Sequence, residues 1–238
     1  MDAEDSGRDR DPSTPLRFLV SGGSGGIGAA VCAQLAERGY VPVAGYHRNA
    51  AAADAVAQRC GGIALALDLQ DEASIAAAVE QLEAGPPLAG VVLAGSPPLA
   101  LAPFGKIEAS DMQQQWQVNV IGPQRLLAEL VRRCFRKRKQ GAVVGVLTAA
   151  MGSGANGIEG AASGMGAYVI AKHGLAGVLA MLAADYPWLR VRAVKPGYTE
   201  TRMLDAFDER FLAMQREKAP FQTPAQVAST IVQEALGS

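Results

Sequence analysis

Tyr168 and Lys172 are the two side chains of this sequence whose types and spacing most clearly favour chemistry. They lie four residues apart, so a helix places the phenol and the ammonium on one face and on adjacent turns. A free tyrosine has a pKa near 10 and is a poor proton relay at neutral pH. A cation about 4 Å away contributes on the order of 4 kcal/mol at an effective dielectric of about 20, which is sufficient to lower that pKa by a unit or more. The spacing therefore predicts a pair that acts together on a proton.

A glycine-rich turn indicates a second kind of chemistry. Residues 17–20 read RFLV, residues 21–28 read SGGSGGIG, and residues 29–35 are helix formers. Glycines permit positive φ and lack the Cβ atoms that would keep a pyrophosphate away from backbone N–H groups, while a helix N-terminus adds about half a positive charge. The order strand, turn, helix predicts a dinucleotide site. A flexible linker is the alternative, which the flanking elements disfavour.

The end of the next predicted strand indicates which dinucleotide binds. Tyr46-His47-Arg48 lies about 20 residues past Gly28, where an NAD site places Asp or Glu against the ribose hydroxyls. A guanidinium instead grips the 2′-phosphate of NADPH with two parallel hydrogen bonds, and Ser24 is positioned to add a hydroxyl contact. The sequence predicts NADPH. The alternative interpretation makes Arg48 a surface cation at a strand end.

Short apolar runs alternate with Ala-rich helical stretches from Leu16 onward, which is the pattern of repeated βα units. The expected fold is α/β, a Rossmann-type doubly wound parallel sheet of about six strands, in one domain over residues 16–238 after a polar, disordered leader at 1–15. The expected strands are Arg17–Ser21, Val41–Tyr46, Ile63–Asp68, Gly90–Ala94, Ala142–Thr148 and Arg190–Lys195. The expected helices are Ile27–Arg38, Ala50–Cys60, Glu72–Glu83, Asp111–Arg136, Tyr168–Asp185 and Pro224–Leu236.

Composition disfavours several classes of function. The chain has 238 residues and a formal net charge of −1, so no global charge attracts nucleic acid or anionic lipid. The basic run at 132–139 is interpreted as a solvated helix end rather than a nucleic-acid patch. The 3 cysteines show neither CxxC nor Cys/His clustering, so no disulfide or metal site is expected. The leader lacks an apolar core, and prolines interrupt Leu88–Phe104, so we expect a cytoplasmic protein without a membrane span.

These features together resemble the short-chain dehydrogenase/reductases, particularly the bacterial 3-oxoacyl-carrier-protein reductases and polyketide-type ketoreductases. The resemblance extends from Leu16 to the C-terminus and rests on five motifs in order. They are residues 21–28, Ala94-Gly95, Asn119, Tyr168 with Lys172, and residues 196–201. The resemblance implies an NADPH-dependent oxidoreductase that reduces a small-molecule keto group to a hydroxyl, with acyl or polyketide intermediates on a carrier protein or CoA among the candidate substrates. The same site runs backwards as an alcohol dehydrogenase.

The resemblance also implies a role for each matched residue. Tyr168 would give its proton to the substrate oxygen as hydride arrives from the nicotinamide, and Lys172 would bind the nicotinamide ribose and lower the tyrosine pKa. Asn119 would hold a water that links Lys172 to solvent; an amide capping a helix irregularity is the alternative interpretation. The implied cofactor-binding residues are Ser21, Gly22, Ser24, Gly26, Ile27, Gly28, His47, Arg48, Asp68, Leu69, Ala94, Gly95, Lys172, Pro196, Gly197, Thr199 and Thr201.

The sequence departs from the family at the catalytic serine. Thr148 takes its place after the fifth predicted strand, and a threonine hydroxyl has the same donor and acceptor capacity, although its methyl group narrows the approach of a substrate. Ser153 is the competing candidate. The glycine-rich residues 152–166 are expected to form a mobile loop at the substrate pocket. A second departure, Ser96-Pro97-Pro98, loses the amides that brace the centre of the sheet in the family.

Three further expectations concern the C-terminal part. Residues 203–220 are expected to form a substrate lid, with an ordinary amphipathic surface helix as the alternative. The family's seventh strand is missing, and because that strand commonly builds a tetramer contact, a homodimer through the long helices is expected. The altered serine and the inserted loop motivate a second functional hypothesis, a catalytically weak relative that binds cofactor as a scaffold or accessory protein.

Overall fold

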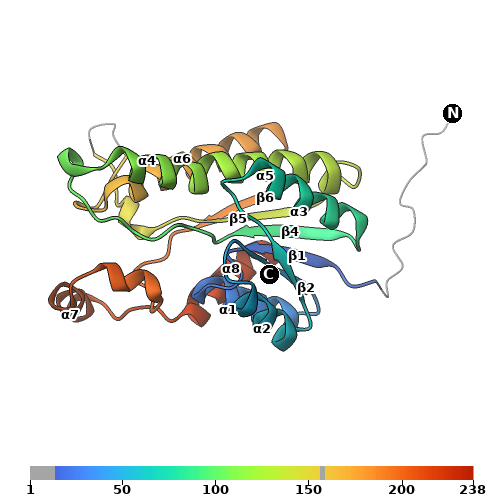
Figure 1. Ribbon diagram of the computed structural model, residues 1–238, viewed down its shortest axis with the longest axis horizontal. Helices are drawn as coiled ribbons and strands as arrows, with labels where there is room; N and C mark the ends of the chain where they lie inside the picture. The colour runs from blue at the N-terminus through green and yellow to red at the C-terminus, as the bar shows by residue number, and fades with distance from the viewer. Residues whose placement is uncertain (1–13, 156–158, 238) are drawn as a thin grey trace.

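A sheet of six parallel strands lies at the centre of the protein (Figure 1). The computed structural model describes residues 14–155 and 159–237; the expected leader therefore lies almost entirely outside the described residues. The strand order is β3-β2-β1-β4-β5-β6, so the chain builds outward from β1 to one edge, then crosses back and continues from β4 to the other. The strands are β1 (Arg17–Ser21), β2 (Val41–Tyr46), β3 (Ile63–Ala66), β4 (Leu88–Leu93), β5 (Ala142–Val146) and β6 (Arg190–Val194).

This strand order confirms the expected doubly wound fold and locates a crevice. In such sheets the strand order reverses between the first and fourth strands, and ligands bind there, beyond the carboxyl ends of the strands. Residues that follow β1, β4 and β5 therefore meet at one edge. Four strands end earlier than expected: β3 and β5 by two residues, at Ala66 and Val146, and β4 and β6 by one residue each. Asp68 and Thr148 consequently lie in the connections beyond their strands, at this edge.

Helices cover both faces of the sheet (Figure 1). One layer contains α1 (Gly26–Glu37), α2 (Ala50–Cys60) and α8 (Pro224–Leu236), and the other contains α3 (Glu72–Ala84), α4 (Ala109–Trp116), α5 (Gly122–Leu130) and α6 (Gly166–Asp185). Successive strand side chains point to opposite faces. Accordingly Phe18 and Val20 pack in the cluster with α1 and α8, whereas Leu19 packs with α3, α5 and α6.

The prediction of a single α-helix over Asp111–Arg136 is wrong for the interior of this segment. The helical path is continuous, but a π-helical turn, η2 (Gln117–Ile121), separates α4 from α5, and a second, η3 (Val131–Phe135), follows α5. Pro123 stands at the start of α5. A proline has no N–H to donate, and its ring clashes with the carbonyl four residues earlier, here that of Asn119. The extra residue of the π-turn relieves this conflict.

The segment after β6 projects beyond the end of the sheet (Figure 1). It contains a short 3-10 turn, η5 (Arg202–Ala206), and the helix α7 (Glu209–Lys218). Two further 3-10 turns, η1 (Phe104–Lys106) and η4 (Ala149–Met151), follow β4 and β5. In the expected basic run, Arg132 pairs with Glu129 and Arg133 with Glu83. Of these segments, η4 and η5 contribute residues to the wall of the site described below.

One helix among the described residues, α6, has the length and hydropathy of a membrane span, and 44% of its apolar window is buried inside the protein. A helix that covers a sheet in a soluble protein satisfies the same two criteria. Here α6 packs on β5 and β6 and against α4. Its first turns also carry the buried side chains of Tyr168 and Lys172, so α6 is a core helix that positions functional groups.

Candidate active site

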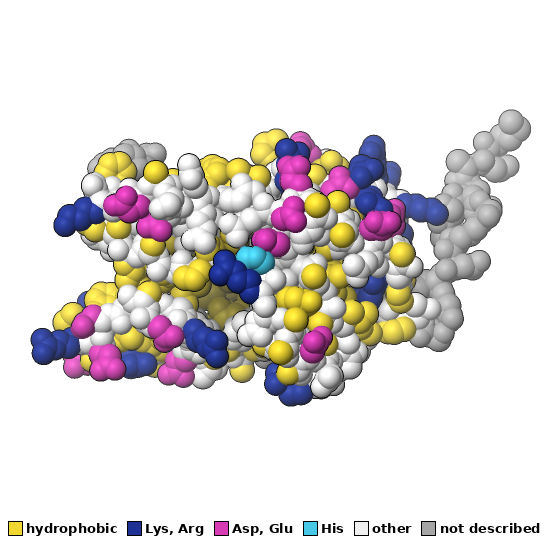
Figure 2. Space-filling view, in the orientation of Figure 1, with side chains coloured by type: hydrophobic (Ala, Val, Ile, Leu, Met, Phe, Trp, Pro, Cys, Tyr) yellow, Lys and Arg dark blue, Asp and Glu magenta, His cyan; other side chains and the backbone are white. Residues whose placement is uncertain are grey.

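A cavity of about 720 Å³ lies at the carboxyl ends of the strands. Its wall contains every cofactor-binding residue predicted from the sequence, together with Thr148, Tyr168 and Lys172. Asn119 lies behind this wall, and Ser153 is exposed and lies outside it. We call the part formed by residues 21–28, 46–49 and 67–70 the glycine-turn end, and the part formed by residues 96–99, 148–150, 162–168 and 198–207 the tyrosine end. Figure 2 shows the hollow, with cationic side chains on its rim.

The glycine turn is held in shape by close backbone contacts. Gly22 has φ of +68°, and a Cβ atom there would lie 2.7 Å from the Cα atom of Gly95. A Cβ atom on Gly28 would lie 2.2 Å from the carbonyl oxygen of Gly22, so only glycine fits at these positions. The hydroxyl of Ser21 accepts a hydrogen bond from the N–H of Gly95 at 3.3 Å. The turn therefore joins the ends of β1 and β4, where the strand order reverses.

The same turn opens α1 in a way that suits an anion. Gly25, the residue before the helix, gives it no side-chain cap, and the first N–H groups of a helix have no intrahelical partner. These donors and the positive end of the helix dipole face the cavity wall formed by residues 24–28 and match a phosphate. The described residues of the glycine-turn end therefore fit the pyrophosphate of a dinucleotide.

A histidine–aspartate contact and an exposed guanidinium mark the outer part of the glycine-turn end. Nε2 of His47 lies 3.0 Å from a carboxylate oxygen of Asp68, whose other oxygen accepts a hydrogen bond from the N–H of Gln70 at 2.9 Å. Arg48 lines the cavity and is exposed. No hydrogen bond or ion pair engages Arg48 within the described part of the chain, and Asp68 is already occupied. The guanidinium is thus available to an anionic group in the cavity.

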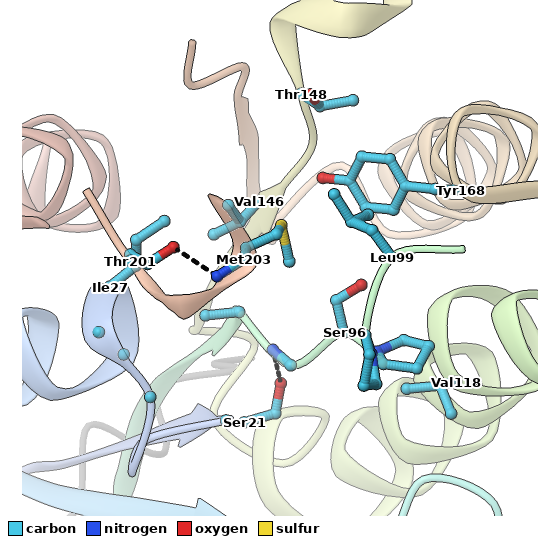
Figure 3. A pocket seen from close by; sticks show the side chains of 18 of the residues that line it. Ser21, Ile27, Ser96, Leu99, Val118, Val146, Thr148, Tyr168, Thr201 and Met203 are labelled. Atoms are coloured by element: carbon cyan, nitrogen blue, oxygen red, sulfur yellow. Dashed lines mark hydrogen bonds between the residues drawn. The ribbon is translucent and has the colours of Figure 1, made fainter. Parts of the chain in front are cut away.

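Tyr168 and Lys172 lie together at the inner wall, as the spacing predicts. Lys172 Nζ is 5.5 Å from the centroid of the Tyr168 ring and donates a hydrogen bond to the carbonyl of Val146 at 2.8 Å. Figure 3 shows the Tyr168 hydroxyl directed into the cavity, with Thr148 nearby on the loop after β5. Thr148 Oγ1 accepts a hydrogen bond from the N–H of Ala150 at 3.2 Å, which fixes the hydroxyl while leaving its proton available for donation.

The pKa of Tyr168 differs from the sequence-based expectation. Burial raises this pKa above its usual range, and a hydrogen bond with Thr148 offsets part of the increase. Burial also lowers the pKa of Lys172 to about 7, because a desolvated ammonium loses its hydration. A lysine that is only partly charged at neutral pH exerts a weak field on its neighbour. The expected lowering of the tyrosine pKa by Lys172 is therefore not found, and Tyr168 keeps its proton at neutral pH.

A buried amide pair connects the π-turn to the loop after β4. Asn119 Nδ2 donates to the side-chain oxygen of Gln115 at 2.9 Å and to Ser96 Oγ at 3.4 Å. Gln115 Nε2 donates to the carbonyl of Pro98 at 2.9 Å. Sequence reasoning missed Gln115, although a polar residue one helical turn before Asn119 was the available signal. These two amides hold the Ser96-Pro97-Pro98 turn in place. They replace the amides whose loss from this turn is expected from the sequence.

One atom of this amide pair has no partner in the described structure. Asn119 Oδ1 is buried and accepts no hydrogen bond, and a buried unpaired acceptor is costly. The π-turn places this oxygen behind the cavity wall. The arrangement is compatible with both interpretations of Asn119, an amide at a helix irregularity and an amide that holds a water.

The tyrosine end has a different character from the glycine-turn end. Met165, Tyr168 and Val169 form a buried cluster, against which Leu99 and Met203 pack. Phe207 joins this cluster and stacks on Phe211, with ring centroids 5.4 Å apart. Of these side chains, all but Val169 and Phe211 line the cavity at the tyrosine end, together with Leu204 and Tyr198.

No cluster of His, Cys, Asp or Glu suitable for a metal ion occurs in residues 14–155 and 159–237.

Comparison with known proteins gives a family for this arrangement. The sequence profile described as short chain dehydrogenase matches residues 17–210, which include β1 to β6 and every predicted catalytic residue. The chain belongs to the short-chain dehydrogenase family.

Individual relatives agree with this assignment. The chain is 31% identical over 222 residues to an acetoacetyl-CoA reductase of Paracoccus denitrificans, covering 90% of this chain and 88% of that protein. It is also 31% identical over 192 residues to a 2,5-dichloro-2,5-cyclohexadiene-1,4-diol dehydrogenase of Sphingobium indicum, covering 79% and 74%. A solved short chain dehydrogenase/reductase family protein has the same fold, with a TM-score of 0.78 and 24% identity over 92% of this chain and 89% of that one. The protein is an NAD(P)-dependent oxidoreductase related to ketoreductases.

Proposed function

We propose that this protein is an NADPH-dependent reductase of ketones in which Tyr168 is the general acid. The observation that carries the proposal is the convergence of Tyr168, Thr148 and Lys172 on the cavity whose other end is the glycine turn. Bound NADPH supplies a hydride, and the protein's own task is to hold the ketone and deliver a proton to its oxygen. The sequence and the cavity together support this division of labour.

The Tyr168 hydroxyl would donate its proton to the ketone oxygen. Because burial raises the pKa of Tyr168, the phenol remains protonated at neutral pH, which is the state that an acid needs. Thr148 would donate a second hydrogen bond to the same oxygen, with its orientation fixed by the N–H of Ala150. Two donors aimed at one oxygen stabilise the negative charge that develops there.

Lys172 and Asn119 would restore the proton. After donation the tyrosinate needs a proton, and Lys172 lies beside its ring. Burial lowers the pKa of Lys172 to about 7. A group whose pKa is close to the surrounding pH can both donate and accept protons. Asn119 Oδ1 lacks a partner in the described structure, which supports a water-holding role. Lys172 would also contact the nicotinamide ribose.

The preference for NADPH over NADH rests on Arg48. It lines the cavity at the position where an NAD site carries an acidic residue, and a guanidinium matches a phosphate in two-bond geometry. The His47–Asp68 pair would face the adenosine beside it. The acetoacetyl-CoA reductase and the diol dehydrogenase among the relatives support a carbonyl and alcohol couple, with reduction as the proposed direction.

Turnover by the pure protein tests the proposal. NADPH is mixed with a panel of β-keto esters, β-keto thioesters, diketones and quinones, and the loss of NADPH absorbance is followed. We expect turnover of at least one class. Binding of NADPH with no turnover of any of them would favour the second hypothesis, a cofactor-binding scaffold, for which the replacement of serine by Thr148 is the supporting observation.

The variant Tyr168→Phe tests the acid directly. It removes one hydroxyl from a cavity wall and keeps the ring, so NADPH affinity should be unchanged. Turnover should fall by about 10²–10⁴-fold, the usual contribution of a positioned general acid. Full activity of this variant would show that another group supplies the proton.

The remaining expectations extend this proposal. Residues 152–166 and 203–220 would border and cover the substrate, since Ala162, Met165, Met203 and Phe207 line the cavity. The protein would be cytoplasmic. It would form a homodimer through the helical path of α4, η2 and α5, where Trp116 and Ile121 are exposed; sedimentation of the pure protein at micromolar concentration measures this state.

A further inference from the structure

Acidic and basic side chains are divided unequally between the two ends of the cavity. His47, Arg48 and Asp68 all lie at the glycine-turn end. Of the described residues that line the rest of the cavity, Lys172 is the one with a charged side chain, and its ammonium is buried and bonded to the carbonyl of Val146. Within the described structure, the tyrosine end therefore offers no exposed cation to a carboxylate or a phosphate.

Apolar side chains from separate segments close around the reacting position. Figure 3 shows Leu99 beside the Tyr168 hydroxyl and Met203 facing it. Met165 and Phe207 complete the same cluster. An ionised group placed among these side chains would lose its hydration without gaining a partner, which is strongly unfavourable. Burial of an apolar group in the same position is favourable.

The polar groups that remain at this end are uncharged. Thr148, Ser96 and Gln114 line the cavity with two hydroxyls and an amide. Such groups form hydrogen bonds with a neutral carbonyl or ester, but they do not compensate a full negative charge as a cation would.

A depression beside the tyrosine end carries carboxylates. Glu200, Asp205 and Glu209 surround a depression on η5 and α7, next to Phe207. Arg216 shares this depression, but its guanidinium lies over the ring of Phe221, 4.6 Å from the ring centroid. The described wall of the tyrosine end thus provides no cationic partner for the phosphates of CoA or of a phosphopantetheine arm, and the three carboxylates of the neighbouring depression would repel phosphates that reach them.

We propose that the substrate is a free, uncharged apolar ketone rather than a keto acid or a thioester of CoA or a carrier protein. This inference rests on the proposed ketone reductase function and specifies its substrate class. In the reaction the ketone takes up two electrons as hydride on its carbon and one proton from Tyr168 on its oxygen, and NADPH is oxidised. The ketone's remaining groups lie against Leu99, Met165, Met203 and Phe207.

Three matched substrates with the same β-keto core test the proposal. They are ethyl benzoylacetate, the free acid benzoylacetate and acetoacetyl-CoA, compared by kcat/KM with NADPH. We expect the ester to exceed the acid by about 100-fold or more, since an unpaired charge is rejected by an apolar wall. Acetoacetyl-CoA should rank below ethyl acetoacetate, which carries the same acyl group without the phosphates.

A pair of phenylalanine variants ties the preference to the wall. Phe207→Ala should lower kcat/KM for ethyl benzoylacetate by about tenfold, with a smaller change for ethyl acetoacetate, because loss of apolar contact in a pocket is worth about that factor. Phe104→Ala is the control, since Phe104 is 88% exposed and lies outside the cavity wall. Equal effects of the two variants would contradict the proposed wall.

The outcomes separate this inference from the proposed function. Faster turnover of acetoacetyl-CoA or of the acid than of the esters overturns the inference and leaves the reductase function standing. If no ketone is reduced, the reductase function fails. Calorimetry of the ester and the acid with the Tyr168→Phe variant and NADPH then measures the preference without turnover, and equal affinities would overturn it.

Discussion

The glycine-turn end and the tyrosine end of the cavity are built from different parts of the chain. At the glycine-turn end the turn itself is formed by backbone, held by contacts so close that a single Cβ atom at Gly28 has no room. At the tyrosine end the wall includes side chains from several connections and from the first turn of α6, with Leu99, Phe207 and Tyr168 among them. A wall formed by backbone atoms suits one ligand group that does not vary. The shape of a wall formed by side chains can be changed by substitution without disturbing the sheet. One end can thus stay fixed while the other adapts.

The largest expected effect comes from placing a methyl group in the glycine turn. Gly28→Ala forces a Cβ atom to within 2.2 Å of the carbonyl of Gly22, so the turn must open and the phosphate-binding N–H groups must move. We expect loss of measurable NADPH binding and a stability decrease of about 3 kcal/mol, measured by fluorescence titration and urea unfolding. Gly105→Ala is the control, since no atom lies within 4 Å of its added Cβ; similar losses in both variants would contradict the comparison.

The pH dependence of stability should report the buried lysine between the two ends. Burial lowers the pKa of Lys172 from 10.5 to about 7, so between these values the unfolded chain binds more protons than the folded one, and stability rises with pH. We expect the wild type to gain on the order of 2 kcal/mol relative to Lys172→Met between about pH 7 and 8.5. Urea unfolding of both proteins across this range measures the difference. A constant difference would show that Lys172 is charged throughout.

Substitution of the assisting hydroxyl should affect only the tyrosine end. Thr148→Val keeps the shape and removes the donor, so kcat should fall by about 10–100-fold with NADPH affinity unchanged. Thr148→Ser keeps the donor and should retain most activity. If Ser153 supplied the hydroxyl instead, Ser153→Ala would show the larger loss, although this residue is exposed and outside the cavity wall.

The smallest expected effect is a change of cofactor preference. Arg48→Asp exchanges a phosphate partner for a group that repels phosphate, so the affinity ratio of NADPH to NADH should fall by about tenfold or more. The matched variant Arg202→Asp alters an exposed cation outside the cavity wall and should leave the ratio unchanged. Tighter NADPH binding by Arg48→Asp would contradict the assignment.

The sequence predicted the glycine-turn end more completely than the tyrosine end, for a physical reason. Local spacing determines the order strand, turn, helix, and the positions of Gly28 and Arg48 follow from it. The tyrosine end depends on contacts between distant segments, such as the bridges that join Ala102 to Met165 and Thr199 to Gln222. No periodicity in the sequence reports such pairs. The spacing of Gln115 from Asn119 was readable, but the hydrogen bond from Gln115 to the carbonyl of Pro98 joins separate segments and exists only in the folded chain.

The electrostatic prediction for Tyr168 failed because burial cannot be read from spacing. Four residues place Tyr168 and Lys172 on one helix face, as predicted, but the same helix buries both side chains. Desolvation then outweighs the attraction between the two groups. It raises the pKa of Tyr168 and lowers that of Lys172, so the neutral form of each side chain is favoured. The nearness of the two groups was predictable from the helix, whereas their charge states depend on the whole fold.

Pro123 has an influence on this cavity that its own side chain never exerts directly. The π-turn at Gln117–Ile121, which we attribute to Pro123, adds one residue to the helical path. One residue corresponds to roughly 100° of rotation about the helix axis, so the side chains of α4 face a different direction relative to those of α5. Leu126, Leu127 and Leu130 therefore remain in the core, while Gln114 and Val118 face the cavity. A ring at the start of a helix thus decides which residues of the preceding helix a substrate meets.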